Sequence, residues 1–525
     1  MGVTWMLAMI GATPPGSEQP TRMTAVARLV RAELTKFRSV RAWMIAICAA
    51  GIGSVLVAYL SALASHAPIP AVPTGYGGEP VSDTYMLVHR SLAGDGTLTA
   101  RVASLAAAHS AAASTSATAA GTSSRGRPGY PQQPGLAPWA KAGIIVEPDM
   151  RQGTPYAAVL VTGSHGVRMQ YDYNRDIPGL AGAAGPSSPR WLRLSRAGDV
   201  IRCYDSADGH SWRKIGVARL AGLPRAVQIG LFVTSPASPA GGTETATTAT
   251  ARFDHIVARG AFSRGPWTAD AVPGVGSGDV YPTVPADSWR QVAAGALTIS
   301  GSGDIAPLVG DIISAQWAGA SIVNGTIVAL LVVIVLATVL ATSEYRRGLI
   351  RATFAASPRR GRVLAAKAIA AGALGFATGT TATAISEVLT RHVLAASGSY
   401  LFPQSGPALA RVVIGTGLLL GLTAALAVAL GMMLRRGTAA VTAGIVLVVL
   451  PGILGSQSGN WLMRLTPAAA FAIQATLPRS SLVASAYTPP NGYFPVSPWA
   501  GLGVLAAYTA LALCAAAWVL RHRDA

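Results

Sequence analysis

Long apolar stretches alternate with polar segments along this chain, and several of them are long enough to cross a lipid bilayer. A helix needs about 20 mostly apolar residues to span ~30 Å of hydrocarbon, because each residue adds about 1.5 Å. The pattern therefore predicts about six transmembrane helices. They are expected at residues 43–64, 320–342, 364–389, 409–434, 438–456 and 498–520.

The segment between the first two spans, residues 65–318, has no apolar run of membrane length. Apolar and polar residues alternate from Val167 to Tyr173, as in a half-buried strand. Asp208-Gly209 is a hairpin signal between strands expected at 200–204 and 212–217. Further strands are expected at 139–146, 156–161, 191–196 and 228–233. The fold class predicted is a polytopic α-helical membrane protein with a large inserted all-β extracytoplasmic sandwich or jelly-roll domain.

Composition and charge strengthen the membrane interpretation. Only 12% of the 525 residues are charged, against roughly a quarter in soluble proteins, which argues against one large soluble enzyme. The net charge of +19 comes mostly from short basic clusters beside the apolar stretches, as in cytoplasmic membrane flanks, so we expect no nucleic-acid partner. The clusters at 22–41 and 343–367 predict that both termini are cytoplasmic, with a tail at 521–525.

The cytoplasmic N-terminus, residues 1–42, contains a second membrane element. Residues 24–43 predict an amphipathic helix that lies at the membrane surface and leads into the first span. Glu33 falls in the middle of its apolar face, so we expect it to meet a basic partner or backbone donors, or to reach lipid headgroups. The apolar stretch Trp5–Ile10 has no basic residues ahead of it, so no cleaved signal peptide is expected, and Met23 is an alternative start.

The motifs of several enzyme classes are missing. The four lysines follow Thr35, Ala140, Arg213 and Ala366, so the Gly-Lys pair of a P-loop does not occur. Neither H-x-x-x-H nor G-x-S-x-G is present. The three cysteines lie in two apolar runs and in the polar middle, and they imply no disulfide. We therefore expect no catalytic residue, cofactor or metal site in this chain.

Two groups of acidic residues leave minor alternatives. Asp205 and Asp208 could form a glycosidase pair, but their place in a predicted turn already explains them. Residues 172–176 resemble the start of a calcium loop, yet Ile177 and Ala183 stand where an EF-hand needs Gly and Glu. An EF-hand is excluded, while another calcium geometry stays open.

Part of the polar middle resembles a known family. The runs SDTYMLVHRSLAGDGTLTARV (82–102), WAKAGIIV (139–146) and WLRLSRAGDVIRCYDSADGHSWRKIG (191–216) resemble concanavalin-A-like (laminin-G-like) domains, over roughly 79–260. The Ala/Ser/Thr/Gly-rich stretch 106–126 interrupts this region, and 262–318 is expected to be an appended small β piece or stalk. The resemblance implies a cell-surface glycan as partner. Its candidate contacts are Trp191, Tyr204 and Trp212, with the alternative that these rings fill the core.

Two cytoplasmic segments carry a second resemblance. RAELTKFRSVRAW (31–43) and SEYRRGLIRATFAASPRRGRVLAAK (343–367) are similar to permease subunits of the type-2 exporter class of ABC transporters, over roughly 24–64 and 320–520. The resemblance implies an interfacial helix, a coupling element at 343–363, four further spans within 364–520, a separate ATP-binding subunit that holds the ATP, and a second permease copy. By position the interfacial helix carries Arg31, Glu33, Lys36 and Arg41, and the coupling residues are Glu344, Tyr345, Gly348, Arg351, Thr353, Pro358, Arg359 and Lys367.

The sequence thus predicts a permease subunit of an ATP-driven exporter in a bacterial plasma membrane, with no enzymatic activity of its own. Glu387, near the outer end of the third span, is a candidate pathway residue, because carboxylates inside a membrane are costly and often functional. An interface position facing water is the alternative. The rival function is a membrane-anchored glycan-binding, adhesion or sensor protein without transport, although one anchor would need one span instead of six. The transported substrate stays open.

Overall fold

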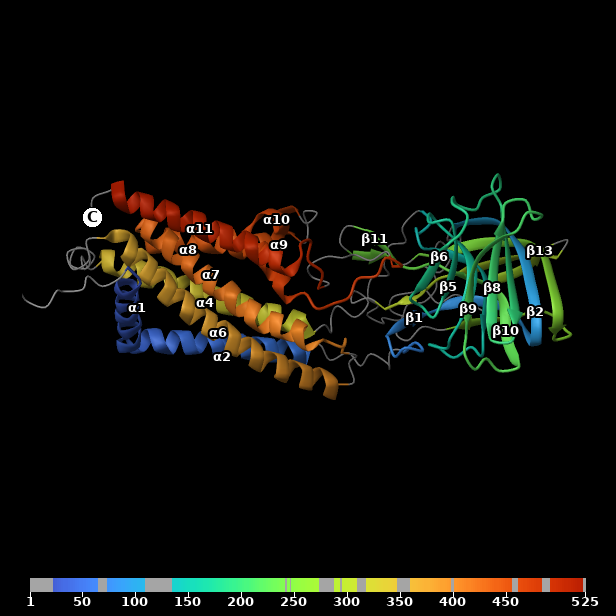
Figure 1. Ribbon diagram of the computed structural model, residues 1–525, viewed down its shortest axis with the longest axis horizontal. Coiled ribbons are helices and arrows are strands. Elements are labelled where there is room, and N and C mark those ends of the chain that lie inside the picture. Colours follow the sequence, from blue (N-terminus) through green and yellow to red (C-terminus); the bar gives the residue numbers. More distant parts are fainter. Residues whose placement is uncertain are drawn as a thin grey trace, which may run out of the picture.

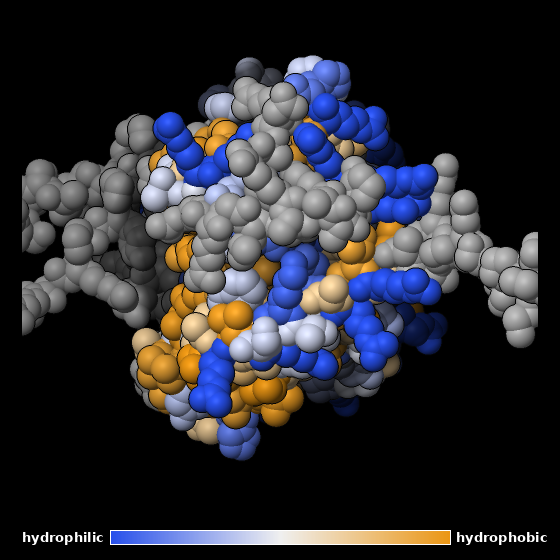
Figure 2. All heavy atoms as spheres, turned by 90° about the vertical axis from the view of Figure 1, so that its left-hand side faces the viewer, coloured by the Kyte–Doolittle hydropathy of each residue, from blue (hydrophilic) through white to orange (hydrophobic). Residues whose placement is uncertain are grey.

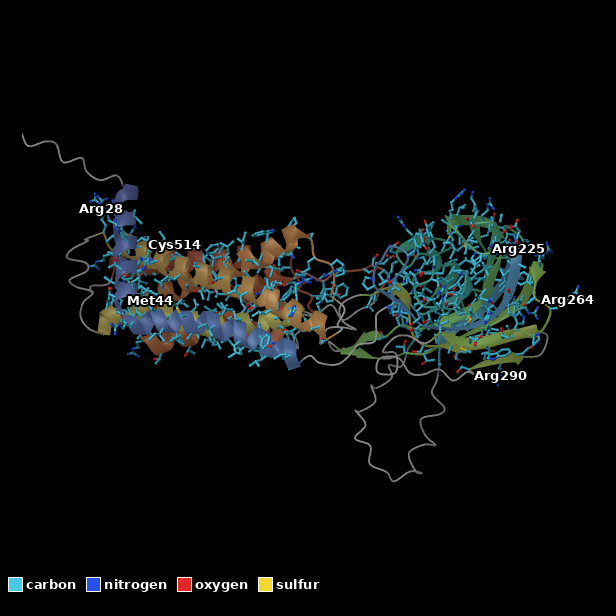
Figure 3. All side chains as sticks on the ribbon, turned by 90° about the horizontal axis from the view of Figure 1, so that it is seen from below. Arg28, Met44, Arg225, Arg264, Arg290 and Cys514 are labelled. Carbon is cyan, nitrogen blue, oxygen red and sulfur yellow. The ribbon has the colours of Figure 1, made fainter. Side chains whose placement is uncertain are left out.

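The computed structural model describes a long molecule with a helical bundle at one end and a β domain at the other (Figure 1). Figure 3 places Arg28, Met44 and Cys514 on the bundle, and Arg225, Arg264 and Arg290 at the far end of the β domain. The structure describes residues 22–64, 73–108, 135–240, 243–245, 247–272, 288–292, 295–308, 318–346, 359–397, 401–455, 461–483 and 492–522.

The bundle contains six helices of membrane length among the described residues, which confirms the predicted number of spans. They run along the long axis of the molecule (Figure 1). Five are α2 (Arg41–Ala64), α4 (Ala318–Arg346), α6 (Arg360–Ala396), α7 (Gly406–Leu434) and α11 (Pro498–His522), and the sixth consists of α8 (Gly437–Val448) and α9 (Leu450–Gly455). The short α10 (Trp461–Leu465) and the 3-10 helix η3 (Pro467–Gln474) follow α9.

Small residues allow α6 and α7 to pack backbone against backbone. A Cβ atom on Gly375 would lie 2.9 Å from the carbonyl oxygen of Leu420, and one on Gly379 would lie 2.9 Å from the Cα of Gly417. Helices in lipid associate mainly through such close packing, because lipid tails are as apolar as the side chains. The Gly-rich third span therefore lies against a neighbouring helix.

The helix α1 (Arg22–Ser39) lies across the end of the bundle, and the chain turns at Val40 into α2 (Figure 1). Its buried residues are spaced four apart: among its described side chains Glu33 and Phe37 are each 5% exposed. The Phe37 ring lies 5.8 Å from that of Trp43, just beyond the turn. The amphipathic pattern thus positions one carboxylate against the bundle.

The β domain is an antiparallel sandwich built around one long strand, β2 (Tyr85–Ala107), which pairs with β10, β13, β14 and β7. The buried core lies between its layers and consists of apolar residues that alternate with outward positions. The other strands are β1 (Val81–Asp83), β3 (Lys141–Glu147), β4 (Ala157–Thr162), β5 (Val167–Tyr171), β6 (Arg175–Pro178), β7 (Arg190–Ala197), β8 (Val200–Ser206), β9 (Arg213–Arg219), β10 (Ala226–Thr234), β11 (Ser238–Ala240), β12 (Thr243–Thr245), β13 (Ala249–Phe262), β14 (Thr268–Val272), β15 (Trp289–Val292), β16 (Ala296–Gly301) and β17 (Ile305–Pro307).

The first and last strands close the domain. β1 pairs antiparallel with β17, from Val81 opposite Pro307 to Asp83 opposite Ile305. Beside this pair, the fully buried Nζ of Lys141 donates to Asp304 Oδ1 at 2.7 Å. The two ends of the domain therefore lie side by side, as an insertion between two helices requires.

Two expectations for the β domain are corrected. The described parts of 262–318 do not form an appended piece, because β14 pairs with β2 and β16 with β13 in the main sheet. The strand expected at 167–173 ends at Tyr171, since Asp172 and Tyr173 have φ of 47° and 59°, a left-handed conformation that turns the chain. The hairpin at Asp208-Gly209 is confirmed, with β8 and β9 paired on either side of it. The Ala/Ser-rich stretch 106–126 lies mostly outside the described residues.

Candidate functional site

Four charged side chains meet where α1 crosses the bundle, and we call them the ionic cluster: Glu33, Lys36, Glu344 and Lys367. Lys367 Nζ donates to Glu33 Oε2 at 3.1 Å and to Glu344 Oε1 at 2.7 Å. Lys36 Nζ donates to the same two residues, to Glu33 Oε1 at 2.9 Å and to Glu344 Oε1 at 3.1 Å. Two carboxylates and two ammonium groups thus form a closed set that joins α1, the end of α4 and the start of α6.

The two lysines of the ionic cluster differ in exposure. The side chain of Lys367 is fully buried, whereas that of Lys36 is 47% exposed. Burial alone would lower the pKa of Lys36, but the hydrogen bonds and charges of Glu33 and Glu344 outweigh burial and raise this pKa. Lys367 is therefore the buried centre of the cluster, and Lys36 closes it on the solvent side.

The ionic cluster explains why α4 is longer than the expected second span. The sequence pattern ends the second span at residue 342 because charged residues follow, but α4 continues to Arg346. α6 begins at Arg360, so Lys367 lies two turns inside it. Opposite charges neutralise Glu344 and Lys367, so both can remain within long helices.

Further contacts connect the other helices at this end. The guanidinium of Arg435, at the α7–α8 turn, lies 5.4 Å from the ring centre of Tyr345. Arg360 Nη1 donates to the carbonyl oxygen of Leu520 in α11 at 2.8 Å. Figure 2 shows hydrophilic residues gathered over this end of the bundle, with hydrophobic ones toward its edge. The exposed charged residues there include Arg31, Arg38, Arg41, Arg359 and Arg436.

The structure brings together four of the twelve residues assigned by the exporter resemblance. Glu33, Lys36, Glu344 and Lys367 form the ionic cluster, while Arg31, Arg41 and Arg359 are exposed beside it. Gly348, Arg351, Thr353 and Pro358 lie outside the described residues. Sequence reasoning expected a basic partner for Glu33 but did not identify Lys367. The available signal was a lone lysine inside an otherwise apolar span.

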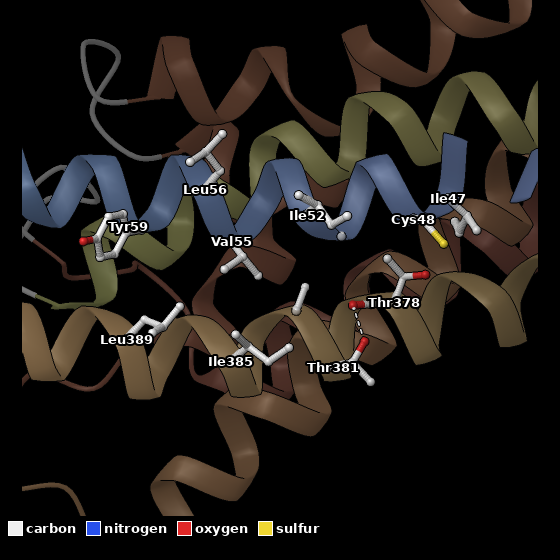
Figure 4. Close-up of a pocket in the computed structure, with 12 residues that line it drawn as sticks. Ile47, Cys48, Ile52, Val55, Leu56, Tyr59, Thr378, Thr381, Ile385 and Leu389 are labelled. Atoms are coloured by element: carbon white, nitrogen blue, oxygen red, sulfur yellow. Dashed lines mark hydrogen bonds between the residues drawn. The ribbon is translucent and has the colours of Figure 1, made fainter. Parts of the chain in front are cut away.

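A groove of 780 Å³ runs between α2 and α6 on the side of the bundle (Figure 4). Its lining is almost entirely apolar, with Ile52 from α2 and Ile385 from α6 both more than half exposed. The hydroxyls of Thr378 and Thr381 donate to carbonyl oxygens of their own helix, Leu374 at 2.9 Å and Ala377 at 2.8 Å. The groove can therefore accommodate apolar chains.

Glu387 does not line this groove. It lies on α6, is 3% exposed, and its Oε2 has no hydrogen-bond partner in the described part of the chain. Thr383, Ser386 and Thr390 are buried on the same face of the helix. The alternative of a position open to water is thus wrong for Glu387, and its role as a pathway residue stays a prediction.

The predicted glycan contacts lie outside the core. Trp191, Tyr204 and Trp212 are half-buried and belong to neither of the two core clusters of the β domain, so the alternative that they fill its interior is wrong. They belong to β7, β8 and the β8–β9 turn. The guanidinium of Arg193 lies 3.7 Å from the ring centre of Trp212.

The interior of the β domain contains buried acids next to tyrosines. Glu147 Oε2 accepts from the Tyr85 hydroxyl at 2.5 Å, and Asp83 Oδ2 accepts from Tyr173 at 2.8 Å. Burial raises the pKa of Glu147 to about 8 and that of Asp83 to about 6. Glu147 is therefore mainly protonated at neutral pH. Among the described residues no group of His, Cys, Asp and Glu could hold a metal ion.

No family model matches the chain, and no curated protein matches it. Among solved structures, it is similar to a functionally unknown protein from Saccharomyces cerevisiae, with 13% identity over 36% of this chain and 82% of that one, and a TM-score of 0.22. It is also similar to scytalido-glutamic peptidase in two inhibitor complexes, with 7% and 9% identity over 42% of this chain and 98% of that one, and TM-scores of 0.24 and 0.22. At such scores the likeness carries no conclusion. The fold defines a multi-pass membrane protein with a large β-sandwich domain.

Proposed function

We propose that this chain is the membrane-spanning permease subunit of an ATP-driven exporter of the ABC type, and that a separate subunit binds and hydrolyses the ATP. The ionic cluster is the observation that supports this proposal most. It ties the interfacial helix α1 to the two helices that flank residues 347–358, within the segment that resembles a coupling element. A displacement of that segment would therefore move α1, α4 and α6 together.

The coupling would be mechanical. ATP-driven closure of the partner displaces the 343–363 element, and because Glu344 and Lys367 are paired with each other and with α1, the ends of α4 and α6 move together. The bundle then shifts between two states, each favoured by one nucleotide state of the partner. In this proposal a second permease copy completes the transport path, and Glu387 contributes a carboxylate to it.

The proposed topology has α1, the ionic cluster and both termini in the cytoplasm, with the β domain outside. The exposed arginines around the cluster support it, since positive charge is enriched on the cytoplasmic side of membranes. Labelling of single cysteines in intact cells with a membrane-impermeant maleimide tests it, in a background lacking the three native cysteines. Arg264→Cys in the β domain should react, and Arg351→Cys should react only after permeabilisation. The opposite pattern would exclude the coupling role.

The partner is tested by purification from native membranes. We expect an ATP-binding subunit in stoichiometric amount, and we expect the ATPase rate of the complex to depend on the ionic cluster. The matched pair is Lys367→Met against Lys36→Met, which remove one charge each from the buried and the exposed side. The first should uncouple ATPase activity from cargo movement and the second should change little. Absence of an ATPase with retained glycan binding would favour the anchored adhesion protein.

A further inference from the structure

One outer face of the β domain collects positive charge from five neighbouring strands. The strands β9, β8, β7, β2 and β13 lie side by side in that order. In one row Lys214 is opposite Tyr204, which is opposite Arg193. In the next row Arg202 is opposite Ser195, which is opposite Thr97, which is opposite Arg259. Because side chains alternate between the faces of a strand, these residues share one face.

The intervening residues show that this face points away from the core. Leu194 and Cys203 lie between the outward positions of β7 and β8, and both are fully buried. Lys214 and Arg259 are exposed, and Arg193 and Arg202 are half-buried. We call Arg101, Arg193, Arg202, Lys214 and Arg259 the basic sheet face.

Most of the charge on the basic sheet face is not neutralised. Asp254 accepts two hydrogen bonds from Arg101, at 2.6 and 2.7 Å. Arg202, Lys214 and Arg259 have no hydrogen bond or ion pair from their side chains within the described residues. Burial and the neighbouring charge of Arg259 lower the pKa of Arg193. Arg193, Arg202, Lys214 and Arg259 thus have no carboxylate partner within the described residues, and their like charges repel one another unless an anion lies between them.

The aromatic rings beside these cations support them and are not free to stack on a ligand. Arg193 lies over Trp212 at 3.7 Å and donates from Nε to Thr99 Oγ1 at 3.2 Å. Arg101 lies 5.7 Å from the ring centre of Trp191, and a Cβ on Gly209 would come within 2.6 Å of that ring. A ligand would therefore meet guanidinium groups instead of open tryptophan faces.

The spacing of the charges selects among anionic polymers. Arg193 and Arg202, diagonal neighbours on adjacent strands, are about 7–8 Å apart. Since adjacent strands are about 4.8 Å apart, Lys214 and Arg193, two strands apart, are separated by about 10 Å, and Arg202 and Arg259, three strands apart, by about 14 Å. This is sparse for a nucleic acid, whose phosphates recur on every unit and whose bases need free aromatic faces. A polysaccharide with an acidic group on only some of its sugars matches such spacing.

We propose that the basic sheet face binds an acidic polysaccharide, whose carboxylate, sulfate or phosphate groups pair with these five cations, and that Trp191 and Trp212 position Arg101 and Arg193. Guanidinium groups suit such anions because their planar N–H groups match two oxygens at once. The proposal stands apart from transport, since it concerns only the β domain. In this proposal the two tryptophans position arginines instead of contacting the glycan directly.

The test measures binding of the purified full chain to polygalacturonate, dextran sulfate and a phosphate-bearing polysaccharide, with neutral dextran as control. The triple variant Arg193→Ala, Arg202→Ala, Arg259→Ala should bind at least ten-fold more weakly. The matched control removes three exposed arginines at the far end of the domain, Arg225→Ala, Arg264→Ala and Arg290→Ala (Figure 3), and should bind as the natural chain does. The polymer that binds most tightly identifies the acidic group.

Several outcomes would overturn the proposal: equal binding of neutral dextran, unchanged binding by the triple variant, or an equal loss in the matched control. Tighter binding of poly-glutamate, oligo-dT or anionic vesicles would instead assign the face to a protein, a nucleic acid or a membrane. Trp212→Leu separates positioning from charge. It should weaken binding several-fold with an unchanged salt dependence, whereas Arg193→Ala should also reduce that dependence, because one cation fewer releases fewer counterions.

Discussion

The bundle and the β domain both bury ionisable groups, but they neutralise them in different ways. In the bundle, the carboxylates of Glu33 and Glu344 face two lysines, so the charges are kept and paired. In the β domain, Glu147 lies beside a tyrosine hydroxyl, and burial raises its pKa to about 8, so its charge is removed by a proton. The first arrangement links helices through paired charges, while the second makes stability depend on pH.

The largest expected effect follows from removing the centre of the ionic cluster. Lys367→Met leaves Glu33 and Glu344 buried with only the half-exposed Lys36 as partner, and breaking a buried pair in this way typically costs about 3–5 kcal/mol. We expect a clear drop in the midpoint of thermal unfolding of the purified full chain in detergent. Lys367→Arg, which keeps the charge, should lose less. Unfolding midpoints within a degree of the natural chain for both variants would show that the cluster does not hold the helices together.

The protonated Glu147 predicts a pH effect on the stability of the β domain. The folded-state pKa of Glu147, about 8, lies above its ordinary value of 4.5, so the folded domain binds more protons than the unfolded chain. Its contribution is fully present below pH 4.5 and is lost as the pH rises through about 8. Between pH 5 and pH 7 this corresponds to about 2 kcal/mol, or about 4–8 °C in the unfolding midpoint.

Calorimetry of the full chain at a series of pH values measures this loss. Glu147→Gln should make the pH dependence of the β-domain transition less steep, because an amide cannot ionise, and should leave the part that comes from Asp83, whose pKa is raised to about 6. Asp95→Asn is the matched control, since Asp95 is exposed and is not among the charges that raise the pKa of Glu147. A transition that stays equally steep in Glu147→Gln would contradict the assignment of the proton to Glu147.

A smaller effect is expected from the hydroxyl next to this carboxyl group. Tyr85→Phe removes the hydrogen bond to Glu147 Oε2 and leaves a buried oxygen unsatisfied, at a cost of about 1–3 kcal/mol. In the Glu147→Gln background the loss should differ from that in the natural chain, because residues that share one hydrogen bond are not independent. Equal losses in both backgrounds, measured by calorimetry, would show that the two groups do not interact.

The ionic cluster of the bundle and the buried acids of the β domain were not equally predictable from the sequence. The amphipathic pattern of residues 24–43 placed Glu33 on the apolar face, and this alone required a partner. That the partner is Lys367 depends on three helices meeting at one point, and no local pattern encodes this. Asp83 of β1 contacts Tyr173, and Glu147 of β3 contacts Tyr85, so each acid meets a tyrosine distant in sequence, and the burial of the acids was not predictable from alternation.

The errors in the β domain have similar causes. The Gly/Pro/Ser-rich composition of 262–318 resembles a linker, and it concealed the short strands β14 to β16, which are stabilised by pairing with distant strands. The alternation of apolar and polar residues continues through Asp172 and Tyr173. The chain nevertheless turns there, because Tyr173 packs inward and its hydroxyl donates a hydrogen bond to Asp83. In both cases a tertiary contact outweighs the local pattern.

The smallest expected effect concerns the exposed member of the ionic cluster and sharpens the comparison within the bundle itself. Lys36 contacts the same two carboxylates as Lys367, but its side chain is 47% exposed, so solvent and salt screen its charge. Lys36→Gln should therefore change stability by only about 0–1 kcal/mol, and the difference from the natural chain should shrink further in high salt. Thermal unfolding of the full chain at low and high salt measures this. A loss as large as that of Lys367→Met, unaffected by salt, would mean that the cluster is closed to water on the side of Lys36, and burial would then not be what distinguishes the two lysines.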